Sequence, residues 1–306
     1  MRVLLIGLGS IGKKHVDALL KVEPEVEIFA LRSGKNGEQY KTVRNIFSLP
    51  DRDVKFDFAI IANNTSLHER AIIDMLESGL PLFIEKPVLS NLENYDFIKS
   101  QIDQKKIITY VACNLRFHPA LIYIHDYLRR EALRINEVNI YCGSYLPEWR
   151  PGKNFRTIYS ANKDMGGGVH LDLIHEVDYC TWLFGFPEKV YSNKTSKSSL
   201  QIDAIDNARY IFSYPEFDVS ISLNYYRRDA KRTIEIVTEE GTLSVDLLKN
   251  EITNDRSMKC LHSGDYNFMD TYSQQMEYFI NNVRDGKEMM NDFSYAANVL
   301  NLALYE

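Results

Sequence analysis

The first third of the chain alternates short apolar runs with amphipathic stretches, a pattern typical of strands joined by crossover helices in a parallel sheet. The predicted strands are Val3–Ile6, Val26–Leu31, Phe56–Ala62, Leu82–Ile84 and Ile107–Cys113. The predicted helices between them are Ile11–Leu20, Leu67–Ser78 and Asn91–Gln104. Residues 58–61 are apolar at consecutive positions, as expected of a strand that is covered on both faces.

The pattern changes after Cys113. Runs rich in aromatic and β-branched residues predict an antiparallel sheet with strands at Glu137–Tyr145, Lys189–Asn193, Asn207–Tyr214, Asp218–Tyr226, Arg232–Thr238 and Thr242–Leu247. Helices are predicted at Pro119–Arg130, Val169–Phe184, Tyr272–Arg284 and from Phe293 to the end, and Glu240-Gly241 marks a hairpin. The fold class is therefore α/β, with a parallel-sheet domain over residues 1–114. An α+β domain with a mainly antiparallel open sheet follows over residues 115–306.

Composition agrees with two globular domains and excludes several partners. The chain has 306 residues, of which 45% are hydrophobic, enough for a core in each domain. Its 36 Lys and Arg against 42 Asp and Glu give a net charge of −6, so it lacks the basic excess expected of a nucleic-acid-binding protein. No apolar run is long enough to span a membrane, and no signal peptide precedes Arg2, so we expect a cytosolic protein.

The four cysteines lie far apart in the sequence. Cys113, Cys142, Cys180 and Cys260 show no paired spacing, which argues against a zinc site and against a disulfide framework. We therefore expect reduced, mostly buried thiols and no bound metal.

A glycine-rich turn joins the first predicted strand to the first predicted helix. In Gly7-Leu8-Gly9-Ser10-Ile11-Gly12, the first glycine permits the tight turn, the second lets the backbone approach a pyrophosphate, and the third lets the helix pack closely on the strand. The helix start at Ser10 and Ile11 then offers amide groups and a positive dipole end to the phosphates. The motif predicts a Rossmann dinucleotide-binding domain, and the alternative is a purely structural glycine turn.

The end of the second predicted strand bears on the choice of cofactor. A carboxylate at this position accepts hydrogen bonds from the ribose hydroxyls of NAD, whereas this chain has Arg32 and Ser33. An arginine beside a serine suits the 2′-phosphate of NADP, so NADP is favoured and NAD stays open. Alternatively, Arg32 stacks on the adenine or is solvated.

Glu85-Lys86-Pro87 follows a predicted parallel strand, at the edge of the sheet where ligands of such folds bind. Lys86 is a candidate to contact both the nicotinamide and a substrate hydroxyl, with a pKa lowered by burial to suit proton exchange. A surface ion pair of Glu85 and Lys86 is the alternative.

A run of glycines, Gly166 to Gly168, opens the predicted helix Val169–Phe184. On a continuous helix, Asp172, His175, Glu176 and Tyr179 share one polar face, opposite to Leu173, Val177, Cys180 and Phe184. A carboxylate and an imidazole one turn apart predict catalytic roles for Asp172 and His175, whereas an isolated histidine on a helix is more often structural.

The stretch Leu146–Lys163 has no clear period and is predicted to be a loop on the substrate side. Trp149 and Arg150, with Lys153 and Arg156, combine aromatic surface with cations, which suits a sugar that bears a phosphate, a nucleotide or a carboxylate. Tyr159 in the same stretch is a further candidate for substrate binding and for the proton path. A solvated surface loop is the alternative.

Together, the glycine turn, Glu-Lys-Pro and the glycine-led helix with Asp and His resemble the Gfo/Idh/MocA (glucose–fructose oxidoreductase and inositol dehydrogenase) family. The segment Ala62–His68 resembles the family segment after the third strand, with Asn63 and Asn64 where Thr and Pro are common. The segment Asn114–Pro119 resembles the family pattern Asn-x-Arg-Phe-x-Pro. The resemblance covers nearly the whole chain.

The resemblance implies hydride transfer between NAD(P) and a secondary hydroxyl of a sugar or cyclitol, with Lys86 and His175 in the proton path. It further implies cofactor contacts by Asn63, Asn64, His68, Glu85 and Lys86, and substrate contacts by Lys86, Arg116, Trp149, Arg150, Tyr159, Asp172 and His175. Asp172 lies three residues before His175, where four is the common separation, so its assignment is the less certain of the two.

The resemblance also implies dimers or tetramers built through the antiparallel sheet. Its aromatic-rich strands outnumber the helices available to cover them, which predicts an exposed face in a monomer. A function of another class is a nucleotide-bound regulatory or assembly subunit that keeps the fold but performs no turnover.

Overall fold

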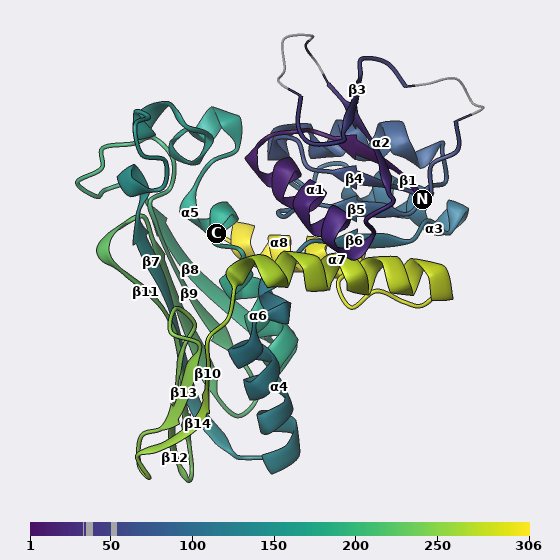
Figure 1. Ribbon diagram of the computed structural model, residues 1–306. Coiled ribbons are helices and arrows are strands. Elements are labelled where there is room, and N and C mark those ends of the chain that lie inside the picture. Colours follow the sequence, from purple (N-terminus) through teal and green to yellow (C-terminus); the bar gives the residue numbers. More distant parts are fainter. Residues whose placement is uncertain (33, 35–38, 50–53) are drawn as a thin grey trace. The chain divides into compact units, whose positions relative to one another are not determined.

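The computed structural model describes residues 1–32, 34, 39–49 and 54–306, which form two compact units (Figure 1). The first unit comprises Met1–Asn114 and Asn267–Asn298, and the second comprises Leu115–Tyr266 and Val299–Glu306. The break after Asn114 coincides with the domain boundary drawn from the sequence. Residues 267–298 differ, because the sequence pattern places them in the second domain and the structure groups them with the first.

The sheet of the first unit has six strands, all parallel, in the order β3-β2-β1-β4-β5-β6. The strands are β1 (Arg2–Ile6), β2 (Glu27–Leu31), β3 (Arg44–Ile46), β4 (Phe58–Ile61), β5 (Leu82–Ile84) and β6 (Thr109–Val111). Strand β4 is buried at every position, as its unbroken apolar run predicts. The parallel Rossmann sheet is therefore confirmed, with β3 as an additional edge strand that the sequence pattern does not reveal.

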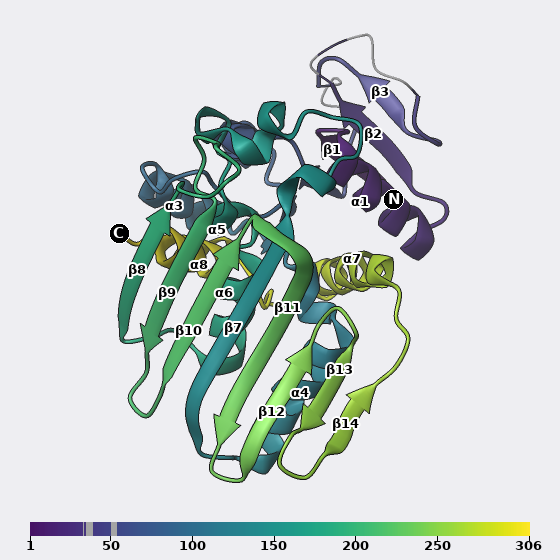
Figure 2. The same cartoon turned by 90° about the vertical axis from the view of Figure 1, so that its left-hand side faces the viewer.

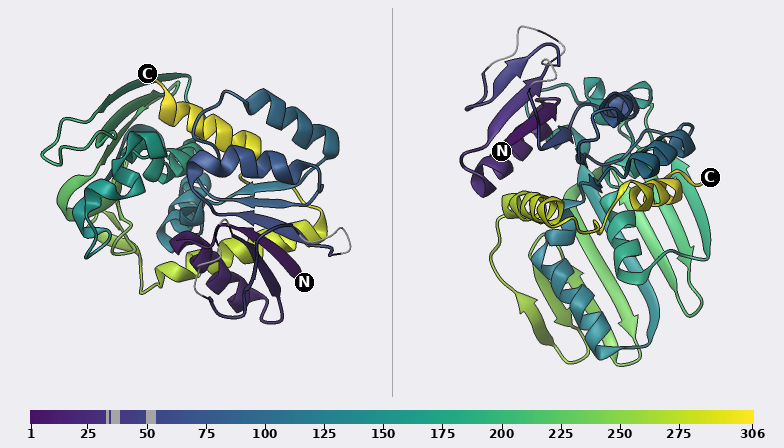
Figure 3. Two further views of the ribbon diagram at one scale, coloured as in Figure 1. Left: turned by 90° about the horizontal axis from the view of Figure 1, so that it is seen from above. Right: turned by 90° about the vertical axis from the view of Figure 1, so that its right-hand side faces the viewer.

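Helices cover both faces of this sheet (Figure 3). They are α1 (Ser10–Val22), α2 (His68–Leu76), α3 (Tyr95–Lys105) and α7 (Phe268–Asp285). Helix α7 buries Tyr272, Met276, Phe279 and Ile280, which recur at helical spacing and join the core of the first unit. This apolar stripe, together with ion pairs from Lys21 to Asp270 and from Arg284 to Glu23, explains why residues far along the chain belong to the first unit.

The second unit contains an eight-stranded sheet in the order β14-β13-β12-β11-β7-β10-β9-β8 (Figure 2). Its strands are β7 (Ile135–Tyr145), β8 (Lys189–Thr195), β9 (Asn207–Ser213), β10 (Asp218–Asn224), β11 (Tyr226–Thr238), β12 (Gly241–Asp246), β13 (Glu251–Asn254) and β14 (Lys259–Ser263). Of the strand pairs described in this sheet, only β7 and β10 run parallel. The mainly antiparallel sheet and the hairpin, in which Thr238 faces Gly241, are confirmed.

One face of this sheet packs on helices, and the other is open within residues 115–266. Helices α4 (Pro119–Glu131) and α6 (His175–Phe184) lie behind the strands in Figure 2. In β9, Ala208, Tyr210 and Phe212 are buried toward them, whereas Arg209 and Ile211 are exposed. Helix α8 (Phe293–Leu304) closes the chain and divides between the two units.

The predicted helix Val169–Phe184 is two helices in the structure, α5 (Val169–Asp172) and α6. Leu171 and Leu173 are two residues apart, so they would point to nearly opposite sides of a continuous helix. Both are buried, at 4% and 8% exposure, because the chain changes direction at Leu173 and Ile174. The break separates Asp172, at the end of α5, from His175, at the start of α6.

Among the described residues, no helix combines the length and the apolar character that a bilayer crossing requires.

Candidate active site

The glycine turn after β1 has the geometry that a dinucleotide requires. Gly7 has φ +97°, and a Cβ there would lie 2.5 Å from the backbone nitrogen of Asn63. A Cβ at Gly12 would lie 2.1 Å from the carbonyl oxygen of Gly7, so α1 and the turn touch directly. At Gly9, by contrast, a Cβ would meet no described atom within 4 Å beyond its chain neighbours. The turn is thus packed on the inside and open at Gly9, where α1 begins, which fits a bound pyrophosphate.

Arg32 lies directly after β2 and is attached to β3. Its backbone N–H donates to the carbonyl oxygen of Ile46 at 2.9 Å, and its Nη1 donates to Oδ1 of Asn45 at 3.3 Å. The guanidinium is half-buried, which leaves part of it accessible. Ser33, the second predicted 2′-phosphate contact, lies outside the described residues.

Glu85 and Lys86 follow β5 at its carboxyl end. The Glu85 side chain is buried, with Oε1 2.5 Å from Nε2 of His15 and Oε2 accepting from the backbone N–H of Lys86 at 3.1 Å. Burial alone would raise the pKa of Glu85, but the His15 hydrogen bond and the nearby positive groups hold it below its ordinary value. Glu85 is therefore buried and hydrogen-bonded within the first unit, which does not fit the alternative of a surface ion pair.

His68 and Asn63 join the ends of β4 and β5. His68 is buried and places Nδ1 3.0 Å from the carbonyl oxygen of Pro87 and Nε2 3.2 Å from that of Asn63. Burial lowers the pKa of His68 despite these carbonyls. The Asn63 side chain donates to the carbonyl oxygen of Leu67 at 3.4 Å, and Asn64 is exposed. Of these predicted cofactor contacts, only Asn64 presents an exposed side chain.

In the second unit, Asp172 is held by a residue that the sequence patterns do not indicate. The hydroxyl of Tyr225 donates to Oδ2 of Asp172 at 2.5 Å, and Tyr225 is fully buried. Burial, followed by the charge of Asp172, raises the pKa of Tyr225 well above its ordinary value, so the phenol keeps its proton. Asp172 itself is half-buried.

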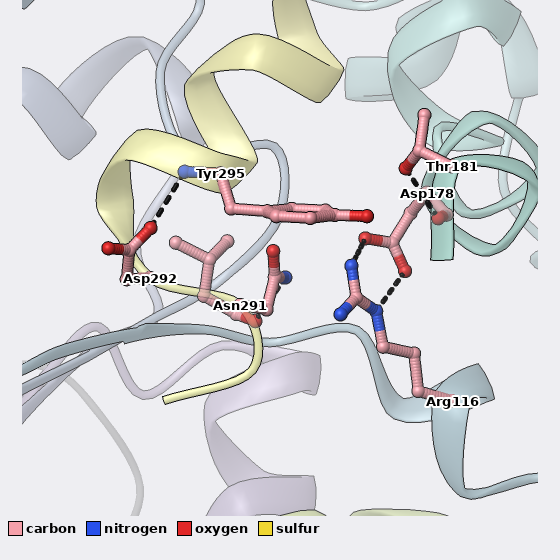
Figure 4. A network of polar contacts seen from close by, with 7 residues as sticks. Arg116, Asp178, Thr181, Asn291, Asp292 and Tyr295 are labelled. Atoms are coloured by element: carbon pink, nitrogen blue, oxygen red, sulfur yellow. Dashed lines mark hydrogen bonds and ion pairs between the residues drawn. The ribbon is translucent and has the colours of Figure 1, made fainter. Parts of the chain in front are cut away.

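His175 is half-buried at the start of α6, and two buried ion pairs fix the residues that follow it. Glu176 accepts from Nε of Arg232 at 2.6 Å. Asp178 accepts two hydrogen bonds from Arg116, at 2.9 and 2.6 Å (Figure 4). Both ion pairs fix the first turn of α6, which begins at His175.

One prediction about this helix is wrong. Glu176 and Tyr179 are fully buried and do not share a polar face with the half-buried His175, and Arg232 provides Glu176 with an internal partner. Arg116, predicted to contact substrate, is buried before α4, and its guanidinium is engaged by Asp178 of α6.

The loop between β7 and α5 carries the remaining candidates. Trp149 packs edge-on against Tyr225 with ring centroids 5.2 Å apart, and its Nε1 donates to Oγ of Ser144 at 2.9 Å. Arg150 is exposed. A Cβ at Gly167 would lie 2.2 Å from the carbonyl oxygen of Tyr159, so a glycine is required where the loop packs on the glycine run. The structure thus brings Trp149, Tyr159 and Asp172 together around Tyr225.

Over the residues that the structure describes, no three His, Cys, Asp or Glu side chains gather in an arrangement able to hold a metal ion.

Two protein-family models match most of the chain. Residues 1–113 match the model of an oxidoreductase family with an NAD-binding Rossmann fold, and residues 133–244 match the GFO/IDH/MocA C-terminal domain. The chain belongs to the GFO/IDH/MocA family. The family resemblance inferred from the glycine turn, Glu-Lys-Pro and the glycine-led helix is therefore confirmed.

Named relatives in this family act on inositols and use either nicotinamide cofactor. The chain is 22% identical over 311 residues to the scyllo-inositol 2-dehydrogenase (NAD(+)) of Bacillus subtilis, covering 94% of this chain and 87% of that protein. It is 23% identical over 205 residues to the scyllo-inositol 2-dehydrogenase (NADP(+)) IolW of the same organism, covering 63% and 54%.

Solved structures show the same fold. A levoglucosan dehydrogenase in complex with NADH and levoglucosan superposes with a TM-score of 0.83 at 18% identity, covering 99% of this chain and 95% of that one. The WlbA dehydrogenase of Bordetella pertussis, in complex with NADH and UDP-GlcNAcA, gives a TM-score of 0.82 at 20% identity, with 100% and 94% covered.

Proposed function

We propose that the protein is an NAD(P)-dependent dehydrogenase or reductase that acts on a secondary hydroxyl or ketone of a sugar, a sugar derivative or a nucleotide sugar. The observation that carries this proposal is the glycine turn, open at Gly9 and closed at Gly7 and Gly12, in a chain of the GFO/IDH/MocA family. When bound, the nicotinamide exchanges a hydride with the carbinol carbon of the substrate.

The roles that we assign to the residues follow from their positions. Gly7, Gly9, Ser10, Ile11 and Gly12 hold the pyrophosphate at the start of α1, and Asn64 adds an exposed polar contact at the end of β4. Lys86 and His175 exchange the proton of the substrate hydroxyl. Asp172 binds the substrate with its orientation fixed by Tyr225, while Trp149, Arg150 and Tyr159 supply aromatic and cationic contacts.

A non-catalytic regulatory or assembly subunit is the less favoured function. Lys86 and His175 are both present and half-buried, in places where local contacts fix the backbone around them. A chain without turnover would not need to keep both residues.

The direct test is reduction of NAD or NADP across a panel of free sugars, cyclitols, sugar acids and nucleotide sugars, followed through the absorbance of the reduced nicotinamide. We expect turnover with one class and its loss in Lys86→Met. Cofactor binding without turnover across the whole panel, in either direction, would favour the regulatory function instead.

We further propose a preference for NADP, carried by Arg32. Its guanidinium is half-buried and anchored by Asn45, so it is pre-positioned at the end of β2 where the adenosine ribose of a dinucleotide binds. Arg32→Asp should weaken NADP binding by ~1.5–3 kcal/mol, the scale of a charge-assisted hydrogen bond, and change NAD binding far less. Equal losses of affinity for NADP and NAD in a fluorescence titration would show that Arg32 does not discriminate between the two cofactors.

We also propose a homodimer or homotetramer built through the open face of the eight-stranded sheet. Tyr191 and Ile211 are 58% and 45% exposed on this face, beside a shallow hollow of about 400 Å³. Glu137 and Asp218 lie on adjacent strands at one end of this face, where Lys189 also lies, and Arg209 lies toward the other end. A second copy packed with its strands reversed would bring these carboxylates toward its Arg209.

Sedimentation velocity at micromolar concentration tests this assembly. We expect a dimer or tetramer for the wild-type protein and a smaller species for Ile211→Lys. A monomer for the wild-type protein would contradict the proposal, and Lys163→Ala, in the loop before α5, serves as the surface control.

A further inference from the structure

Lys86 stands between two residues that are each held by a buried histidine. Its predecessor, Glu85, binds His15 on α1, and its successor, Pro87, binds His68 on α2. Both histidines and the whole Glu85–Pro87 segment belong to the first unit. The backbone on both sides of Lys86 is therefore fixed by side chains that come from two different helices.

The contact on the first side is oriented by its surroundings. His15 has no exposed surface and packs edge-on against the rings of Phe83 and Tyr272, with centroids 5.0 and 5.9 Å away. Its Nδ1 has no hydrogen-bond partner among the described residues, whereas Nε2 lies 2.5 Å from the Glu85 carboxylate. The Nε2 proton therefore faces Glu85, and the apolar rings leave the imidazole one direction in which to donate.

This contact is transmitted to Lys86 through Glu85. One carboxylate oxygen of Glu85 accepts from His15, and the other accepts from the backbone N–H of Lys86 at 3.1 Å. A carboxylate that receives one donor on each oxygen cannot rotate without losing a hydrogen bond in a buried place. The orientation of the Lys86 backbone is thus linked to the His15 ring.

The contact on the second side limits the movement of the chain after Lys86. The His68 ring spans the carbonyl oxygens of Pro87 and Asn63, at 3.0 and 3.2 Å. The neutral imidazole carries one N–H, so it donates to one of these carbonyl oxygens and packs against the other. The ring therefore lies between the segment after β5 and the segment after β4, which begins the loop that packs on Gly7. A shift of the segment after Lys86 would disturb this contact.

We propose that His15 and His68 are positioning residues for Lys86, which fix the backbone from which its side chain extends. Neither histidine touches the substrate or the cofactor in this role. The effect on turnover rests on the proposed function, whereas the effect on the environment of Lys86 does not. Catalytic groups displaced by about 1 Å lose on the order of 10²-fold in rate, so the contribution is measurable.

The test compares substitutions at His15 that differ in a single property. His15→Leu fills the space without a donor, whereas His15→Gln places an amide donor near the position of Nε2. We expect kcat to fall by on the order of 10²-fold in His15→Leu and to recover most of the loss in His15→Gln, with the Kd of the cofactor changed little. The pH dependence of kcat should shift in His15→Leu and stay close to that of the wild-type protein in His15→Gln.

A second measurement does not need a known substrate. Competitive acetylation of lysines at a series of pH values, read by mass spectrometry of the peptides, reports the reactivity of Lys86 in the full-length protein. We expect His15→Leu and His68→Leu to change the labelling profile of Lys86, while His15→Gln keeps it close to wild type. Lys189, on β8 of the second unit, is the internal control and should label alike in every variant.

Should His15→Leu fail to fold, Glu85→Gln provides the same comparison, because it keeps the shape and replaces one of the two acceptor oxygens by a donor. A folded His15→Leu or Glu85→Gln with wild-type labelling of Lys86 would overturn the proposal. Equal effects of His15→Leu and His15→Gln would also overturn it, because packing rather than the hydrogen bond would then be responsible. Changed labelling in a protein that turns over no sugar would leave this inference standing and reject the proposed function alone.

Discussion

The segments that carry Lys86 and His175 are both fixed by buried polar contacts, but of different kinds. Around Lys86, histidine rings bind a carboxylate and backbone carbonyls. Around His175, arginines bind the carboxylates of Glu176 and Asp178. Hydrogen bonds of the first kind fix the direction of a few backbone atoms. Ion pairs of the second kind fix a whole helix start, and the loss of one partner leaves a charge buried in the protein.

The difference implies that the two segments should respond differently to substitution. Changes around Lys86 should affect both rate and stability, because a variant such as His15→Leu leaves the buried Glu85 carboxylate without one of its two donors. Near His175, substitution of His175 itself should lower the rate, whereas substitution of Arg116 or Arg232 should lower the stability of the fold.

The largest effect is expected at His175. His175→Ala should lower kcat by ~10²–10⁴-fold, the usual contribution of general acid–base catalysis, with the Kd of the cofactor nearly unchanged. If Lys86 and His175 act as one proton-transfer unit, the double variant with Lys86→Ala should be little worse than the poorer single variant. Steady-state kinetics and cofactor titration measure both, with His125→Ala on α4 as the control. Wild-type turnover in His175→Ala would make this histidine structural.

Next in size is the ion pair beneath the helix. Arg116→Met should destabilise the protein by ~3–5 kcal/mol, because Asp178 would remain as an unpaired buried charge. Arg116→Met combined with Asp178→Leu should recover much of this loss, measured by urea unfolding. Arg130→Met, which breaks an exposed pair with Glu131, is the matched control and should have little effect. A single variant as stable as wild type would remove the distinction between the two segments.

The smallest expected effect concerns the tyrosine behind Asp172. Tyr225→Phe removes a buried hydrogen bond to a carboxylate and should cost ~1.5–3 kcal/mol of stability. It should also lower kcat/KM, since Asp172 would lose its fixed orientation. Tyr305→Phe, at an exposed position near the end of the chain, is the control. Unchanged unfolding and unchanged kcat/KM in Tyr225→Phe would show that Asp172 is held by other contacts.

The predicted elements of the fold were those with strong hydrophobic periodicity. Strand Phe58–Ile61 coincides with an apolar run, and the hairpin at Gly241 coincides with turn residues, so both were predicted where the structure has them. The missed strands β3, β13 and β14 are short and of mixed polarity, and they lie at an edge of their sheet or next to it, so their pairing is decided by the neighbouring strand. The break at Leu173 was not predicted, because residues on all sides of this segment are buried and the sequence pattern then does not distinguish one helix from two.

The site was predictable where chemistry and position coincide in the sequence. The glycine turn and the Glu-Lys-Pro segment are local in the sequence, and both lie within the residues that match the NAD-binding Rossmann model. The ion pair of Arg116 with Asp178 was not predicted, because the two residues lie far apart along the chain. His15 and Tyr225 were missed for a related reason, since each sits in an otherwise apolar core pattern and gains meaning only from the carboxylate that the fold brings to it.

The parallel pairing of β7 with β10 has a consequence for the kinetics of folding. Strand β7 ends at Tyr145, and its neighbours β10 and β11 begin only at Asp218 and Tyr226. Strands that follow each other in sequence, such as β9 and β10 or β11 and β12, can form hairpins locally. Strand β7 pairs with β10 and β11 only after the long intervening segment has brought them together. The pairing of β7 with β10 and β11 is therefore the slow step expected in the folding of the second unit.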